Sequence, residues 1–306
     1  MSIPNIHDIT LPLLELLVDG KDHNFFDLMK TLSKSFELTE SDLQERIASG
    51  NSRFQNRLGW ARTELKMAGL IEYPKTRILR ITQRGLDVLK NKPPRIHRAF
   101  LQQFSEYREK VDGAGDSPTT NNSTGTMRSS DEKLTPEESM DAASQSIRSR
   151  IKSELLEKIM QCTPAFFERL VVDLLVKMGY GGTMRDAGEA IGKSGDGGID
   201  GTIKEDKLGL DVIYLQAKRW ESGVGRPQIQ NFVGALHGKG NKGVFITTSS
   251  YSKEAIEYAK SLGNLKIILI DGDKLADLMI EHNVGVSPKQ IYEIKKVDYD
   301  YFSEEE

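Results

Sequence analysis

Two stretches of the chain carry the hydrophobic periodicity of folded domains. In the first, which we place at residues 1–104, apolar positions recur at helical spacing and then alternate. The predicted helices cover residues 10–19, 24–35, 40–49, 52–68 and 83–90, and the predicted strands cover 70–73 and 77–81. Helices followed by a β-hairpin are typical of a winged helix-turn-helix domain, in which the last helix before the hairpin enters the DNA major groove.

The second stretch, residues 147–306, alternates helical and strand patterns. Thr163 and Pro164 form a helix start, with threonine as the N-cap and proline at the first helical position. The pattern predicts a hairpin of strands 199–204 and 210–218, helices over 227–237, 252–262 and 273–282, and strands over 243–248 and 265–271. This order predicts an α/β domain with a mixed central sheet.

Between these stretches, residues 105–146 contain few large apolar residues and no periodicity. Such a segment cannot bury enough apolar surface to offset the entropy lost on ordering. We therefore expect a flexible acidic linker here.

Composition limits the class of protein. Hydrophobic residues make up 38% of the 306 residues, the mean hydropathy is −0.45, and no run is long enough to span a membrane. The N-terminus lacks the pattern of a secretory signal, and the single cysteine excludes a disulfide framework. A soluble cytoplasmic protein with no membrane partner is the expectation.

The overall charge of −3 hides strong local differences. Residues 53–98 have a net charge of +9, whereas residues 105–146 and the tail 298–306 each have −5. The helix over 52–68 buries a stripe that includes Phe54 and Leu58, and its basic residues lie off that stripe. A basic face is usually only a solvated surface, but this one coincides with the DNA-contacting elements of a winged helix. The expected DNA-binding residues are Arg53, Arg57, Arg62, Lys66, Lys75, Arg77 and Arg80, with Arg219 and Arg226 of the second domain as further phosphate contacts.

Three residues of the second domain's hairpin carry candidate chemistry. Asp200 begins one strand, and Gln216 and Lys218 lie two positions apart on the other, so both project to one face. Glu168, on the preceding helix, is a further candidate carboxylate. Oxygen ligands of this kind hold Mg²⁺ or Mn²⁺, which neutralises a scissile phosphate, while a lysine stabilises the transition state or acts on the attacking water. Without further context, a polar strand edge and an aspartate in a glycine-rich turn are more commonly structural.

A resemblance changes that balance. The segment from Phe166 to Tyr180 resembles the opening helix of the restriction-endonuclease-like nucleases, and Gly195–Gly201 with Tyr214–Trp220 resembles their PD-(D/E)xK core. More narrowly, the chain resembles the Mrr branch, in which glutamine replaces the acidic residue of the last motif; Gly243–Ser249 matches a strand typical of that branch.

The resemblance implies a type IV restriction endonuclease, which cleaves double-stranded DNA carrying foreign methylation with Mg²⁺ or Mn²⁺. It assigns Asp200, Gln216 and Glu168 to the metal and Lys218 to catalysis. Gln216 departs from the wider superfamily, and a neutral amide binds metal more weakly than a carboxylate. Because one active site cuts one strand, a double-strand break implies a homo-oligomer.

Two other functions remain as alternatives: a DNA-binding regulator with a non-cutting nuclease-like domain, and a nuclease specific for DNA junctions. A nucleotide cofactor is not expected, because residues 188–194 resemble a phosphate-binding loop but Ala187 stands where its first glycine is required.

Overall fold

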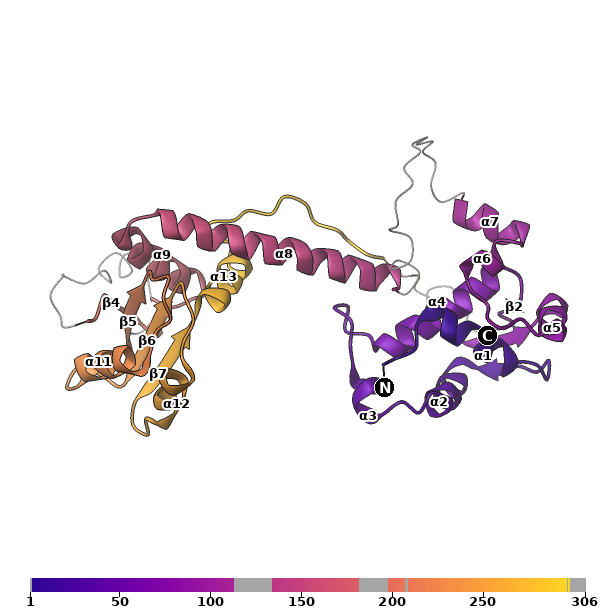
Figure 1. Ribbon diagram of the computed structural model, residues 1–306, viewed down its shortest axis with the longest axis horizontal. Helices are drawn as coiled ribbons and strands as arrows, with labels where there is room; N and C mark the ends of the chain where they lie inside the picture. The colour runs from indigo at the N-terminus through magenta and orange to yellow at the C-terminus, as the bar shows by residue number, and fades with distance from the viewer. Residues whose placement is uncertain (1, 113–133, 182–197, 207–208, 296, 298–306) are drawn as a thin grey trace. The chain divides into compact units, whose positions relative to one another are not determined.

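The chain forms two compact units, Met1–Gln145 and Ser146–Lys295 (Figure 1). The computed structural model describes residues 2–112, 134–181, 198–206, 209–295 and 297. The division between the units falls within helix α8 (Pro136–Gln161). None of the described helices combines the length and apolar character that crossing a bilayer requires.

The first unit has winged-helix topology, as the sequence predicts. Its elements are α1 (Ile6–Glu15), β1 (His23–Asn24), α2 (Phe25–Ser35), α3 (Glu40–Gln44), α4 (Arg53–Met67), β2 (Ile71–Glu72), β3 (Ile78–Ile81), α5 (Gln83–Lys90), α6 (Arg98–Leu101) and α7 (Ser105–Asp112). Strand β3 pairs antiparallel with both β1 and β2 and lies between them. Helix α4 is therefore the helix that immediately precedes the wing hairpin.

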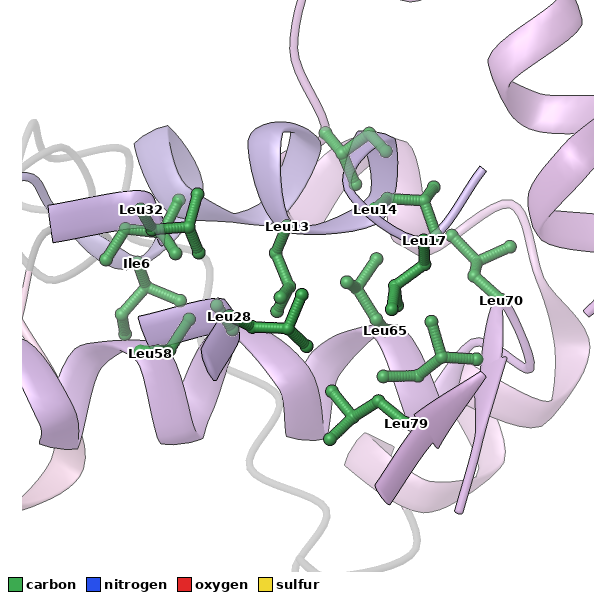
Figure 2. Close-up of a cluster of buried hydrophobic side chains, with 14 of the residues drawn as sticks. Ile6, Leu13, Leu14, Leu17, Leu28, Leu32, Leu58, Leu65, Leu70 and Leu79 are labelled. Carbon is green, nitrogen blue, oxygen red and sulfur yellow. The ribbon is translucent and has the colours of Figure 1, made fainter. Parts of the chain in front are cut away.

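Leucine and isoleucine side chains from most of these elements meet in one core (Figure 2). Helix α1 packs along α4, and Leu13, Leu58 and Leu65 are fully buried where they meet. Helix α1 begins at Ile6, four residues earlier than the apolar pattern predicts. The reason is a capping box: Asn5 accepts hydrogen bonds from the first-turn amides, and Asp8 accepts one from Asn5.

The expectation of a flexible linker over residues 105–146 is wrong at both of its described ends. Helix α7 buries Tyr107, whose hydroxyl donates a 2.7 Å hydrogen bond to Glu64. Helix α8 begins at Pro136 after Thr135, whose hydroxyl accepts a hydrogen bond from the Glu138 amide. These contacts order segments whose composition alone predicts disorder. The middle part, 113–133, lies outside the described residues.

A buried ion pair joins the start of α8 to α4. The Arg57 guanidinium lies 3.0 Å from a carboxylate oxygen of Glu138 and also donates a 2.6 Å hydrogen bond to the carbonyl of Ile3. Both side chains are less than a tenth exposed. Arg57, one of the expected DNA-binding residues, is therefore not on an open face of α4, because the acidic first turn of α8 covers that flank of the helix.

The second unit contains the predicted mixed sheet, in the order β4-β5-β6-β7. Its elements after α8 are α9 (Pro164–Lys177), β4 (Gly201–Lys204), β5 (Val212–Lys218), α11 (Arg226–Leu236), β6 (Lys242–Thr247), α12 (Lys253–Ser261), β7 (Lys266–Ile270) and α13 (Gly272–Glu281). Strand β4 is antiparallel to β5, and β5, β6 and β7 are parallel. Residues of α8, α9 and α13 bury one face of the sheet, and α11 and α12 bury the other.

The buried ion pair yields a first expectation. Glu138→Gln should lower the free energy of unfolding of the first unit by about 3 kcal/mol, because Arg57 is left buried without its counter-charge. Glu137→Gln is the matched control: Glu137 accepts a hydrogen bond from the Trp60 indole, and a glutamine oxygen can still accept it. We expect a change of about 0.5 kcal/mol or less there. Urea unfolding in a Trp220→Phe background, followed by Trp60 fluorescence, measures both; equal losses would contradict the assignment.

Two helical glycines of the first unit should respond oppositely to alanine. At Gly85 an added Cβ would lie 2.3 Å from the carbonyl oxygen of Leu70, whereas at Gly59 it would meet nothing within 4 Å. Gly59→Ala should raise the free energy of unfolding by up to about 1 kcal/mol through helix propensity. Gly85→Ala should lower it by about 1–3 kcal/mol through steric overlap. Thermal melts of the two variants test this, and a stabilising Gly85→Ala would refute it.

Candidate active site

Asp200 and Lys218 meet where strands β4 and β5 separate. The Asp200 amide still pairs with the carbonyl of Leu215, at 2.9 Å. The Ala217 amide, the next one on the β4 side of β5, has no backbone partner on β4 and donates instead to the Asp200 carboxylate, at 2.8 Å. The Lys218 ammonium lies 3.3 Å from the same carboxylate oxygen. The Asp200 side chain thus replaces a backbone partner at the end of the ladder, and this fixes it beside Lys218.

Glu168 lies across a small cleft from Asp200. It stands on the first turns of α9, after the Thr163 cap, and it lines the cleft together with Asp200, Gly201 and Ala217. Burial and, secondarily, the negative charge of Asp200 raise the pKa of Glu168, while Lys218 opposes the increase. Two carboxylates and one ammonium therefore act on one another electrostatically at this edge of the sheet.

Gln216 joins this group only in part. It is buried, and strand alternation places it on the face opposite Leu215 and Ala217, as predicted. Its amide lies against the backbone of Gly198, where an added Cβ would be 3.4 Å from Nε2. Gly198 has φ +113°, a conformation that favours glycine. Within the described residues, no hydrogen bond joins Gln216 to Asp200 or Lys218.

The donor set suits a hard divalent cation. Asp200 and Glu168 offer carboxylate oxygens, Gln216 offers an amide oxygen, and cations such as Mg²⁺ complete their coordination with water and phosphate oxygens. Burial is the main cause of the raised pKa of Glu168, and the nearby Asp200 charge adds to it; a cation bound between the two carboxylates would oppose both effects. The described part of the chain contains no group of three histidine, cysteine, aspartate or glutamate residues with metal-site geometry, so the amide would be needed.

Thr247 is a site residue that motif reasoning missed. It is fully buried at the end of β6, opposite Lys218, and its hydroxyl donates a 2.8 Å hydrogen bond to the Lys218 carbonyl. It therefore holds the backbone of the residue that carries the ammonium. The signal was present in the sequence, because Thr247 is a polar residue directly after the apolar run 244–246.

The predicted DNA-binding residues of α4 divide into two groups. Arg57 is buried, and Arg53 is held in ion pairs with Glu45 and Glu138 at 3.1 and 3.5 Å. By contrast, Lys66 is exposed, with its ammonium 4.0 Å from the centre of the Tyr73 ring, and the guanidinium of Arg62 stacks on Phe25 at 4.4 Å. Only the latter pair remains a candidate for contacts with DNA.

The wing and the second unit supply further cations. Lys75 and Arg77 are exposed at the hairpin tip, while Arg80 forms a 2.6 Å ion pair with Asp22. In the second unit Arg226 is exposed, whereas Arg219 donates a 2.6 Å hydrogen bond to the carbonyl of Met160. Arg219 therefore ties β5 to α8, and Lys75, Arg77 and Arg226 are the cations left most accessible to phosphate.

The winged helix and the mixed sheet with its acidic cleft define a nuclease of the restriction-endonuclease type with a DNA-binding unit. A family model described as "Restriction endonuclease" matches residues 159–279, and a second, "Mrr N-terminal domain", matches residues 7–91. A curated relative, the "Type IV methyl-directed restriction enzyme EcoKMrr" of Escherichia coli (strain K12), is 35% identical over 310 residues, 99% of this chain and 100% of that protein. The chain belongs to the Mrr family of restriction endonucleases.

Two solved structures are also similar to this chain. The structure described as "MspJI Restriction Endonuclease in Complex with 27-mer Oligonucleotide" has 21% sequence identity and a TM-score of 0.32, over 68% of this chain and 49% of that one. The "DNA modification-dependent restriction endonuclease AspBHI" has 17% identity and a TM-score of 0.32, over 71% of this chain and 56% of that one. The chain thus spans about half the length of these two proteins.

The charges around the cleft yield an expectation for Glu168. In protein freed of divalent cations, Asp200→Asn should lower the pKa of Glu168, because one negative neighbour is lost. Lys218→Met should raise it, because the opposing positive charge is lost. NMR titration of ¹³C-labelled glutamate side chains measures both shifts, and Lys260→Met, on the exposed end of α12, is the control. If Asp200→Asn and Lys218→Met shift the pKa of Glu168 in the same direction, the arrangement of charges described here around the cleft is wrong.

Proposed function

We propose that this chain is a type IV restriction endonuclease that hydrolyses phosphodiester bonds of double-stranded DNA carrying foreign methylation. The observation that carries the proposal is the contact of the Asp200 carboxylate with the Lys218 ammonium, opposite Glu168, on a restriction-endonuclease sheet. Its support is the full-length similarity to a methyl-directed relative.

Asp200, Glu168 and Gln216 are the residues that would hold Mg²⁺ or Mn²⁺. Bound there, the ion would supply Lewis-acid stabilisation of the scissile phosphate and of charge on the leaving oxygen. The chain's own part is positional. Asp200 holds the Lys218 ammonium at the cleft, where it stabilises negative charge on the phosphate and orients the attacking water. The Thr247 hydroxyl donates a hydrogen bond to the Lys218 carbonyl and so holds in place the backbone from which the lysine side chain extends.

The winged helix supplies DNA affinity. Lys66, Lys75 and Arg77 are exposed on α4 and the hairpin, where phosphate contacts position this fold on the duplex. Since one cleft cuts one strand, we propose that two copies of the chain act together to make a double-strand break.

The test is plasmid cleavage by the purified full-length chain, with methylated and unmethylated plasmids and with Mg²⁺ or EDTA. We expect Mg²⁺-dependent cleavage of methylated plasmid. Asp200→Asn and Lys218→Met should each reduce the rate at least about a hundredfold, because each removes charge stabilisation at the phosphate. Lys260→Met should cleave like the unaltered chain.

Other outcomes identify other functions. Tight binding to one DNA sequence with no cleavage of any plasmid would favour a regulator. Cleavage of branched junctions with methylated duplex left intact would favour a junction nuclease. Undiminished cleavage by Lys218→Met would remove the proposed catalytic site.

A further inference from the structure

The outer side of α4 contains a hollow that the proposed function does not yet use. It has a volume of about 270 Å³ and lies within the first unit, between α4 and the start of α2. Phe25, Asn56 and Arg62 contribute side chains to its walls. Gly59 contributes only backbone, and an added Cβ there would enter open space.

The packing of α4 leaves this side open. Its stripe of Phe54, Leu58 and Leu65 is buried against the core. The flank that carries Arg57 is covered by the first turn of α8. The hollow lies between these two borders: its lining residue Phe25 belongs to the core, and its lining residue Trp60 donates a hydrogen bond to Glu137 of α8. In a winged helix the solvent-facing side of this helix faces the major groove.

Two polar atoms of this hollow's lining residues lack partners. The Asn56 side-chain oxygen and the Arg62 Nε are both buried, and neither has a hydrogen-bond partner among the described residues. A buried polar group without a partner is costly, so such groups are normally satisfied. The lining thus offers an unused acceptor on Asn56 and an unused donor on Arg62, whose guanidinium lies 4.4 Å from the centre of the Phe25 ring.

We propose that this hollow is the base-reading subsite of the protein and that Asn56 is its specificity-determining residue. The ligand is the major-groove edge of a base with an exocyclic amino group, adenine or cytosine. The inference rests on the proposed function, because it presumes that the winged helix binds duplex DNA.

The chemistry of the orphan atoms selects this ligand over a phosphate. A phosphate offers only acceptors, and these cannot satisfy the oxygen of Asn56. In the major groove, adenine N6 and cytosine N4 present N–H donors, whereas guanine and thymine present acceptors there. A turn of the Asn56 side chain into the hollow brings its oxygen to such a donor. The exposed Lys75 and Arg77 lie on the wing instead, where phosphate contacts belong.

The hollow also has space for a modification. Because Gly59 has no side chain, the space above it is open, and the Phe25 ring forms an apolar wall. A methyl group on cytosine C5 projects into the major groove beside N4, so cytosine keeps its N–H donor for Asn56 and places the methyl group in this space. A methyl group on adenine N6 instead takes the place of the major-groove N–H, because the other N–H pairs with thymine. A bulkier residue at position 59 would fill this space.

The experiment measures the affinity of full-length protein in a Lys218→Met background for three short duplexes of one sequence at fixed salt. One duplex is unmodified, one carries N6-methyladenine and one carries 5-methylcytosine. Competition anisotropy gives the ratio of modified to unmodified affinity, and the two modified arms identify the base. Asn56→Ala should weaken binding to the unmodified and the 5-methylcytosine duplex alike by about tenfold, the size of one good base contact, because both present the same N4 donor. Gly59→Ala should lower the ratio for the 5-methylcytosine duplex, although it raises the melting temperature.

Two controls separate base reading from other effects. Asn91→Ala removes an exposed amide at the end of α5 and should leave both the affinity and the ratio unchanged. The salt dependence of binding should stay the same in the Asn56→Ala, Gly59→Ala and Asn91→Ala variants, because none of them removes a phosphate contact or changes a charge.

The inference is overturned if Asn56→Ala keeps the affinity of the parent, or if Gly59→Ala keeps the parent's full ratio. It is equally overturned if Asn56→Ala weakens binding with a shallower salt dependence, which would identify a phosphate site. Failure of the proposed function would give a different result. The unaltered chain would cleave no methylated plasmid, and the Lys218→Met chain would bind modified and unmodified duplexes equally before any residue of the hollow is changed.

Discussion

The hydrogen bond from the Ala217 amide to the Asp200 carboxylate is the contact on which the candidate active site depends. It ends the β4–β5 ladder with a side chain instead of a backbone carbonyl, and it fixes the carboxylate that holds Lys218 at 3.3 Å. Rotation of the Asp200 side chain would break this hydrogen bond and leave the Ala217 amide without its partner. The same bond thus serves the fold and the chemistry.

The first unit shows how a basic helix divides its charges between structure and binding. Arg57 is enclosed with Glu138, and Arg53 is shared between two glutamates, so neither is available to DNA. The acidic start of α8 therefore decides which side of α4 remains accessible. On that remaining side lie Asn56, Gly59 and Arg62, which line the hollow. In the proposed function, phosphate contacts fall on Lys66 and the wing, and base reading falls on Asn56.

Local pattern predicted much of this protein because the relevant physics is local. The alternation along β5 indicated that Leu215 and Ala217 pack inward, and both are buried. The Thr163 cap predicted the start of α9, which carries Glu168. The family resemblance selected Asp200 and Lys218 from many polar residues, and the structure brings these two into contact. Neither spacing nor charge could show that Gln216 lies against Gly198 instead of joining them.

The sequence by itself determined the two-domain architecture, the winged-helix order and the mixed sheet, since periodicity, caps and strand alternation act over a few residues. The pairing of Asp200 with Lys218 was predicted from the family resemblance. Tertiary structure alone decided which cations are free. Arg57 and Glu138 are 81 residues apart in the chain, and their pairing depends on how α8 packs against α4. Burial of a charge is a property of the whole fold, because desolvation depends on every neighbour and not on position along the helix.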